Sequence, residues 1–217
     1  MRTLRAYNST TDAWRREEVQ MHDKILALDL ETSGLNSQYD QILQIGASII
    51  TSDGEIEHEF SARIQPTDKF KISVEALAVQ SGDIKTEDGR DKAFAYLSSL
   101  FSDAQPAKDA ALKLRGWANE VRAWQHPVVA HNASFDWGFW ANFEFQQRTA
   151  LEKKAVFGST WIDTLALARQ LMPGSGSYGL DACLLACGLE RRNDAHNALE
   201  DARLAGMLYF RLMGKAG

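Results

Sequence analysis

The chain has 217 residues, of which 45% are hydrophobic and 24% are charged. This composition suffices for one domain with a buried core, and it excludes an intrinsically disordered chain. No segment approaches the roughly 18 consecutive apolar residues of a membrane span, and the polar N-terminus lacks the apolar stretch of a secretory signal. Two cysteines, Cys183 and Cys187, are typical of small buried side chains in a reducing compartment. We therefore expect a cytoplasmic protein without a membrane partner.

The formal net charge is −5. Proteins that bind nucleic acid usually present a basic face, so this acidity argues against a long electrostatic groove for a polyanion. Two bound divalent cations would add four positive charges at one place, which would suffice for a small contact with a phosphate.

The first predicted element is a short helix over residues 10–20. We therefore expect residues 1–23 to form an N-terminal helical extension and residues 24–217 to form the main domain. A Ser-Asp-Gly turn at residues 52–54 joins two of the three strands that follow. These strands form an antiparallel meander and are predicted over residues 24–31, 41–51 and 55–64.

Helical spacing of apolar residues predominates in the rest of the chain, with one short buried strand at residues 127–130. A meander followed by alternating helices and strands predicts an α/β fold, in which a mixed sheet is flanked by helices. We expect these helices over residues 73–80, 91–103, 107–124, 134–148, 162–171, 178–187 and 197–213.

Two acidic residues lie in the first predicted strand of the meander. Alternation places Asp29 and Glu31 on one face with Ile25 and Ala27, while leucines occupy the other face. Two like charges on a largely buried face repel each other and lose hydration, and a cation bound between them would relieve both costs. The alternative is that the strand ends before them and that both carboxylates are solvated.

Two further acids occupy apolar stripes of predicted helices. At helical spacing Asp136 shares a face with Phe139, and Asp201 shares one with Ala205 and Leu208. Taken singly, each acid has an alternative role as a first-turn residue that complements the helix dipole. Four inward-facing acids from three distant segments instead favour one site for a hard cation such as Mg²⁺ or Mn²⁺. The chain has no HExxH, CxxC, P-loop or GxSxG pattern.

Three motifs that contain these acids resemble one enzyme family. They are LDLETSGL at residues 28–35, HNASFD at 131–136 and HNALEDA at 196–202. Together they resemble the DEDDh branch of the DnaQ-like 3′–5′ exonucleases, and the resemblance covers about residues 24–213. The first motif has Ser33 where threonine is commoner, which is a mild chemical change.

The resemblance implies a ribonuclease-H-like fold and hydrolysis of the terminal phosphodiester of single-stranded DNA or RNA, which releases nucleoside 5′-monophosphates. It implies that Asp29 bridges two divalent ions, either Mg²⁺ or Mn²⁺. Glu31 and Asp201 would complete the site of one metal, and Asp136 would support the other.

The histidine of the third motif, His196, is implied to be the general base, because imidazole titrates near neutral pH. The sister branch of the family has a tyrosine one position later, where this chain has Asn197. Five residues of a helix rotate by roughly 140°, so His196 and Asp201 would not face one site from within one helix. We therefore expect His196 in a loop before the helix, with Asn197 as its N-cap.

Candidate substrate contacts lie near the first and second motifs. Leu35 is a candidate wedge against the terminal base, and the backbone of Thr32 and Gly34 is a candidate contact for the terminal nucleotide. His131 is a competing base or a substrate contact, although a structural role is favoured for it.

Two aromatic residues of the second motif region, Phe135 and Trp140, are candidates for stacking on bases, although core packing is favoured for both. Arg191 and Arg192 are candidates for phosphate contacts, with a solvated loop as the alternative. The segment 85–124 is longer than usual for the family by an extra helix, which would shape substrate access or an oligomer contact.

Several functions remain open on sequence alone. The alternatives to the exonuclease are a non-catalytic nucleic-acid-binding or interaction module, an RNA-specific exoribonuclease of the ribonuclease T or oligoribonuclease kind, and a phosphohydrolase of free nucleotides. No motif reads a 2′-hydroxyl, so DNA and RNA are not distinguished. The chain ends after the last predicted helix, without the polymerase-binding tail of the replicative proofreading subunit, which favours a stand-alone nuclease. A homodimer is compatible with the sequence, but no feature requires one.

Overall fold

The computed structural model describes residues 3–8, 13–18, 22–67, 71–73, 76–77, 86–102, 104–191 and 197–214. Its strands are β1 (Thr3–Asn8), β2 (Ala13–Glu18), β3 (Lys24–Thr32), β4 (Ile42–Thr51), β5 (Ile56–Arg63), β6 (Val128–Ala130) and β7 (Thr160–Asp163). Its helices are α2 (Glu87–Ser102), α3 (Ala107–Glu120), α4 (Ala133–Gln146), α5 (Thr164–Leu171), α6 (Leu180–Ala186) and α7 (Ala198–Met213).

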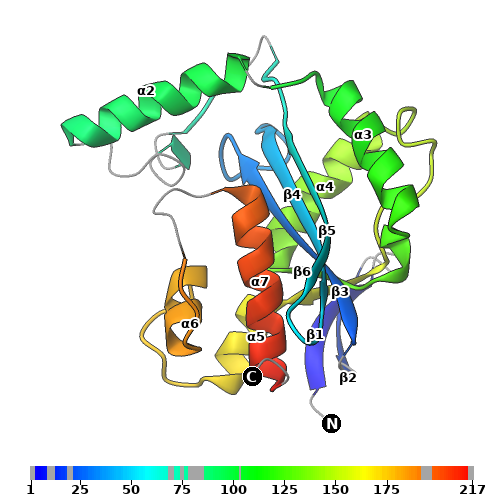
Figure 1. Ribbon diagram of the computed structural model, residues 1–217, viewed down its shortest axis with the longest axis vertical. Coiled ribbons are helices and arrows are strands. Elements are labelled where there is room, and N and C mark those ends of the chain that lie inside the picture. The colour runs from blue at the N-terminus through cyan, green and yellow to red at the C-terminus, as the bar shows by residue number, and fades with distance from the viewer. Residues whose placement is uncertain are drawn as a thin grey trace.

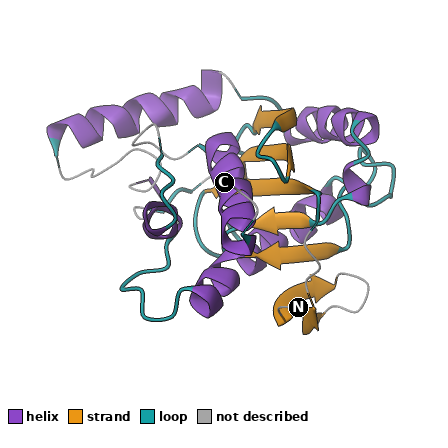
Figure 2. Cartoon of the chain, turned by 60° about the horizontal axis from the view of Figure 1, so that its bottom comes forward, coloured by secondary structure: helices purple, strands orange, loops and turns teal. Residues whose placement is uncertain are grey.

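One mixed sheet forms the centre of the molecule, with the strand order β2-β1-β7-β6-β3-β4-β5 (Figure 1). β3, β4 and β5 are the predicted antiparallel meander, and β3, β6 and β7 run parallel to one another. Helices lie on both sides of this sheet (Figure 2). The predicted mixed sheet flanked by helices is therefore confirmed. Among the described residues, no helix is long and apolar enough to cross a membrane.

Side chains of β3 alternate between two hydrophobic cores. Leu26 and Leu28 belong to the core that includes residues of α3 and α4, whereas Ile25 and Ala27 belong to the core beneath α5 and α7. This alternation matches the prediction. It directs the next residue of the second face, Asp29, toward the N-terminal end of α7.

Two glycines allow α7 to lie very close to the sheet. A Cβ added to Gly46 of β4 would lie 2.1 Å from the carbonyl carbon of Ala198, and one added to Gly206 would lie 2.9 Å from the Cβ of Ala27. Gly46 stands directly opposite Asp29 in the β3–β4 register. The first turn of α7 therefore touches the sheet backbone beside this acid.

The N-terminal segment is a β-hairpin, so the prediction of a helix over residues 10–20 is wrong. β1 and β2 pair antiparallel, from Thr3 opposite Glu18 to Asn8 opposite Ala13. β1 also pairs with β7, and the hairpin thereby extends the sheet past its parallel strands. An edge strand offers unpaired N–H and C=O groups, and pairing with them outweighs a weak local preference for helix.

Other differences concern short elements. β7 was not predicted, because a four-residue strand with two buried residues, Trp161 and Ile162, has no readable periodicity. The predicted helix 107–124 ends at Glu120, and the chain turns at Arg122 with a φ of 52° into a short 3₁₀ turn. Most of the predicted helix 73–80 lies outside the described residues.

We expect Gly46→Ala to lower the free energy of unfolding by about 2 kcal/mol or more, because its methyl group would collide with the backbone of α7. Gly116→Ala in α3 is the matched control, since a Cβ there meets nothing within 4 Å. This control should gain about 0.5–1 kcal/mol from the better helix propensity of alanine. Urea unfolding followed by circular dichroism measures both, and equal stability of the two variants would contradict the close approach of α7.

Candidate active site

Three carboxylates from β3 and α7 meet at one place. Asp29, Glu31 and Asp201 each offer a ligand oxygen, and these oxygens lie within 4.8 Å of one another. Glu31 is 7% exposed and Asp201 is 4% exposed. The alternative of a strand that ends before its acids is wrong, because β3 continues through Thr32. Hard oxygen ligands at this spacing fit Mg²⁺ or Mn²⁺.

The fourth acid, Asp136, projects from the first turn of α4 and is 2% exposed. It is hydrogen-bonded by the backbone of Leu30, and its charge acts on Asp29. The turn before α4 fixes its direction. Asn132 has a φ of 69°, in the left-handed region that asparagine tolerates, and its N–H donates to Oδ1 of Asp163 at 2.9 Å.

Burial and mutual repulsion raise the pKa values of two of these acids. The pKa of Asp29 lies well above its ordinary value, with burial as the largest cause and the charges of Asp136, Glu31 and Asp201 next. Burial is also the largest cause of the raised pKa of Asp136. A cation at this place would offset both effects, so the donor set fits a metal centre.

Arg191 lies inside this acidic group. Its Nη1 donates to Oδ1 of Asp201, and its Nε donates to Oδ1 of Asp181 at 2.9 Å. The side chain of Arg191 is 9% exposed, so a solvated loop is the wrong interpretation for this residue. Burial lowers the pKa of Arg191, but its bonds to Asp201 and Asp181 outweigh this effect and raise it. Arg192 lies outside the described residues.

His131 is held by both of its ring nitrogens. Nδ1 lies 3.0 Å from the hydroxyl oxygen of Thr164, and Nε2 lies 2.9 Å from the carbonyl oxygen of Tyr178. Burial lowers the pKa of His131, which favours the neutral ring. These contacts join β6 to α5 and to the segment before α6, and they agree with the structural role favoured for this residue.

His196 lies outside the described residues, so its position stays a prediction. The N-cap predicted beside it is confirmed. The side-chain oxygen of Asn197 accepts hydrogen bonds from the N–H groups of Leu199 and Glu200, at 3.1 and 3.3 Å. Helix α7 therefore begins after His196, as the rotation between this residue and Asp201 required.

The loop after β3 presents one apolar side chain to solvent. Leu35 is 76% exposed, whereas Thr32 is buried and its hydroxyl donates to the carbonyl oxygen of Gly34 at 2.7 Å. A Cβ on Gly34 would lie 2.4 Å from the carboxylate of Asp40, which in turn accepts a hydrogen bond from the N–H of Asn36. These contacts hold the loop in one shape and leave Leu35, four residues after Glu31 in the sequence, exposed to solvent.

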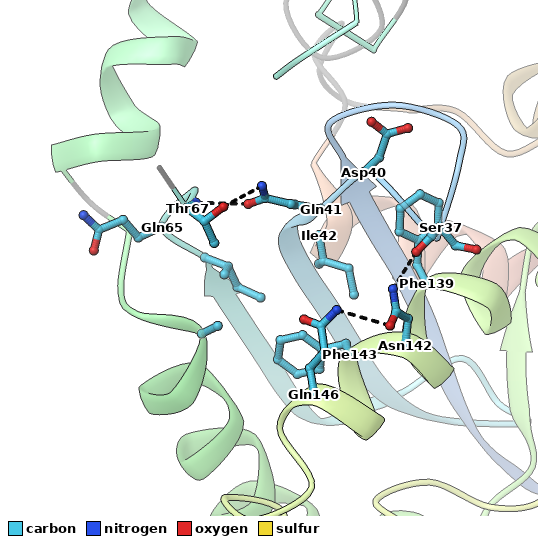
Figure 3. Close-up of a pocket in the computed structure, with 12 residues that line it drawn as sticks. Ser37, Asp40, Gln41, Ile42, Gln65, Thr67, Phe139, Asn142, Phe143 and Gln146 are labelled. Atoms are coloured by element: carbon cyan, nitrogen blue, oxygen red, sulfur yellow. Dashed lines mark hydrogen bonds between the residues drawn. The ribbon is translucent and has the colours of Figure 1, made fainter. Parts of the chain in front are cut away.

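A small pocket of about 80 Å³ shows how this loop is held (Figure 3). Gln41 exchanges two hydrogen bonds with Thr67, of 2.9 and 3.0 Å. Asn142 of α4 donates to the carbonyl oxygen of Ser37 at 2.6 Å and accepts from Gln146 at 3.2 Å. The polar side chains that line the pocket are hydrogen-bonded to one another or to the loop backbone. The bond from Asn142 to Ser37 thereby connects the loop to α4.

The two aromatic candidates differ in their exposure. Trp140 is 1% exposed and packs against Phe143 and Phe157, so the core packing favoured for it is confirmed and its candidate role in stacking on a base is wrong. The reason is that α4 turns this position into the core behind β3. Phe135 is partly buried against Phe139, with ring centroids 4.9 Å apart.

Tyr96 of α2 is influenced by one of the acids, which the sequence did not indicate. Burial raises the pKa of its phenol, and the charge of Glu31 raises it further. Sequence alone held no signal for this interaction, because α2 has a weak apolar stripe and Phe94 on it is 74% exposed.

The chain matches the family model described as "Exonuclease" over residues 26–209. A PolC-type DNA polymerase III of Thermotoga petrophila is 30% identical over 193 residues, which are 87% of this chain and 12% of that protein. The PolC-type polymerase of Staphylococcus saprophyticus is 26% identical over 190 residues, which are 87% of this chain and 11% of that protein. The chain therefore spans only a small part of the length of these curated relatives.

Solved structures share the fold. The nuclease domain of 3′hExo, a DEDDh family member bound to rAMP, superposes with a TM-score of 0.63 at 14% identity, covering 91% of this chain and 96% of that domain. Exonuclease I of E. coli in complex with a dT13 oligonucleotide gives a TM-score of 0.62 at 15% identity, covering 89% of this chain and 42% of that one. The predicted ribonuclease-H-like fold is confirmed. The chain belongs to the exonuclease family.

Proposed function

We propose that this domain shortens single-stranded DNA or RNA from the 3′ end, releasing nucleoside 5′-monophosphates with two divalent ions and with His196 as general base. The observation that carries the proposal is the group of three carboxylates within 4.8 Å, with the buried Asp136 beside it. A binding module would not need this group, because it lowers the stability of the native state without a cation.

Asp29, Glu31 and Asp201 would hold the ions, and Asp136 would support the second of them. Bound Mg²⁺ or Mn²⁺ supplies positive charge that orients a water molecule and stabilises the leaving oxygen. The protein fixes these ligands on rigid elements, since β3 lies in the centre of the sheet and α7 packs directly against it.

The proposed base stands one residue before the N-cap of α7. His196 would accept the proton of the attacking water, for which a group that titrates near neutral pH is suited. The capped helix start at Asn197 supports this role, because His196 directly precedes this cap in the sequence and Asp201 belongs to the first turn of the same helix.

The terminal nucleotide would contact the loop after β3. Leu35 is an exposed apolar side chain close to the acids in sequence, and we propose that it packs against the terminal base. Structural neighbours include exonuclease I with a DNA oligonucleotide and a 3′-exonuclease with specific recognition of a histone mRNA stem-loop. The proposal therefore keeps both DNA and RNA as substrates, with a small contact area that suits the net negative charge of the chain.

We expect saturating Mn²⁺ to raise the thermal unfolding midpoint of the wild type, because an ion that binds only the native state adds about 2.7 kcal/mol at a hundredfold excess over its Kd. Asp29→Asn should lose this increase. The exposed Glu55→Gln should retain it, as a control for removal of a negative charge. Differential scanning fluorimetry in EDTA and in Mn²⁺ measures the three proteins, and an unchanged increase in Asp29→Asn would contradict the metal centre.

We expect 5′-labelled single strands to be shortened stepwise in Mg²⁺ or Mn²⁺, and His196→Ala to slow this by about 10²–10⁴-fold, the range of general-base catalysis. The exposed His58→Ala on β5 is the matched control and should keep the wild-type rate. One panel should compare single- and double-stranded DNA, RNA, a mismatched 3′ end and free nucleotides. Binding without turnover, or hydrolysis of free nucleotides alone, would replace the proposal with one of its alternatives.

A further inference from the structure

Arg191 occupies the position of a counter-ion on the acid that α7 contributes to the site. The guanidinium donates through Nη1 to Asp201, whose ligand oxygen lies within 4.8 Å of those of Asp29 and Glu31. Its positive charge also acts on Asp29. A guanidinium and a divalent ion would repel each other at this distance, so they compete for the same group of carboxylates.

The guanidinium is incompletely bonded where it lies. Its Nη2 atom is buried and has no hydrogen-bond partner among the described residues. A buried N–H group without an acceptor is unfavourable, and a cationic one more so. Arg191 is therefore not fully hydrogen-bonded in this position, which lowers the cost of leaving the contact with Asp201.

A second acid offers Arg191 another position. Asp181, in the first turn of α6, accepts from Nε at 2.9 Å and is 62% exposed at its side chain. It lies outside the group of possible metal ligands. The guanidinium can swing toward solvent around this contact, which would leave Asp201 without losing the ion pair to Asp181.

We propose that Arg191 holds the position of a metal ion on Asp201 in the metal-free protein, and that a divalent cation displaces it from Asp201 while its ion pair with Asp181 is kept. Metal loading is then an exchange of cations. The acids keep a partial counter-charge before the ion arrives, and the ion binds more weakly than it would without the competing guanidinium. This inference rests on the proposed metal centre.

Isothermal titration calorimetry with Mn²⁺ alone tests the exchange. We expect Arg191→Gln to bind Mn²⁺ about tenfold more tightly than the wild type, because the competing charge-assisted hydrogen bond is gone. Arg203→Gln is the matched control. Arg203 is another arginine near the start of α7, but it pairs with Glu59, and its loss should leave the Kd within about twofold.

A double variant, Asp181→Asn with Arg191→Gln, distinguishes the exchange of Arg191 for a metal ion from a general effect of the charge of Asp181. Asp181→Asn should weaken Mn²⁺ binding in the wild type, since the displaced guanidinium would then have lost both of its carboxylate partners. The same substitution should have no effect in an Arg191→Gln background. If it weakens binding equally in both backgrounds, Asp181 acts only as a distant charge and the proposal is overturned.

A crystal structure of the wild type with Mn²⁺ provides a test that needs no variant to fold. Arg191 beyond hydrogen-bond distance of Asp201 supports the exchange, and Arg191 still bonded to Asp201 overturns it. If the experiments on Arg191 fail but Asp29→Asn still abolishes Mn²⁺ binding, the proposed metal centre is supported and only the exchange is overturned. No Mn²⁺ binding by the wild type would overturn the exchange and the proposed metal centre together.

Discussion

The contact between the first turn of α7 and the backbone of β4 decides whether this site can exist. Asp201 reaches the acids of β3 only because Gly46 has no side chain, and a Cβ there would lie 2.1 Å from the carbonyl carbon of Ala198. Gly46 is also the residue that pairs with Asp29. One missing methyl group therefore sets the separation between the two elements that supply the ligands. The packing of α7 on the sheet and the arrangement of the carboxylates therefore depend on the same short stretch of backbone.

The second constraint is electrostatic. The acids raise one another's pKa values and lie in a buried environment, so the site carries a cost in native stability that only a cation can remove. Within the described residues, Arg191 supplies part of this charge through Asp201. It does so with one buried nitrogen that lacks a partner. A group of buried like charges lowers the stability of the native state, and such destabilising groups are often found at functional sites.

Much of the frame could be predicted because it follows from local periodicity. The alternation of β3 assigned Asp29 and Glu31 to one face, and the helical stripe of α4 assigned Asp136 to the interior, where it is 2% exposed. The rotation between His196 and Asp201 required a helix that starts between them, and α7 begins at Ala198.

The rest could not be predicted because it depends on long-range contacts. The N-terminal hairpin forms by pairing with β7, about 150 residues away, and no local pattern carries that information. The pair of Arg191 with Asp201 joins segments whose spacing is set only by the complete fold.

The segment that carries the proposed base is fixed at both of its described ends near one carboxylate. Arg191 is bonded to Asp201, and Asn197 caps the helix whose first turn contains Asp201. His196 is joined directly to this cap, and consecutive Cα atoms are about 3.8 Å apart. The acids are thus held by a strand and two packed helices, and the described residues on either side of the proposed base, Arg191 and Asn197, both meet the helix end that carries Asp201.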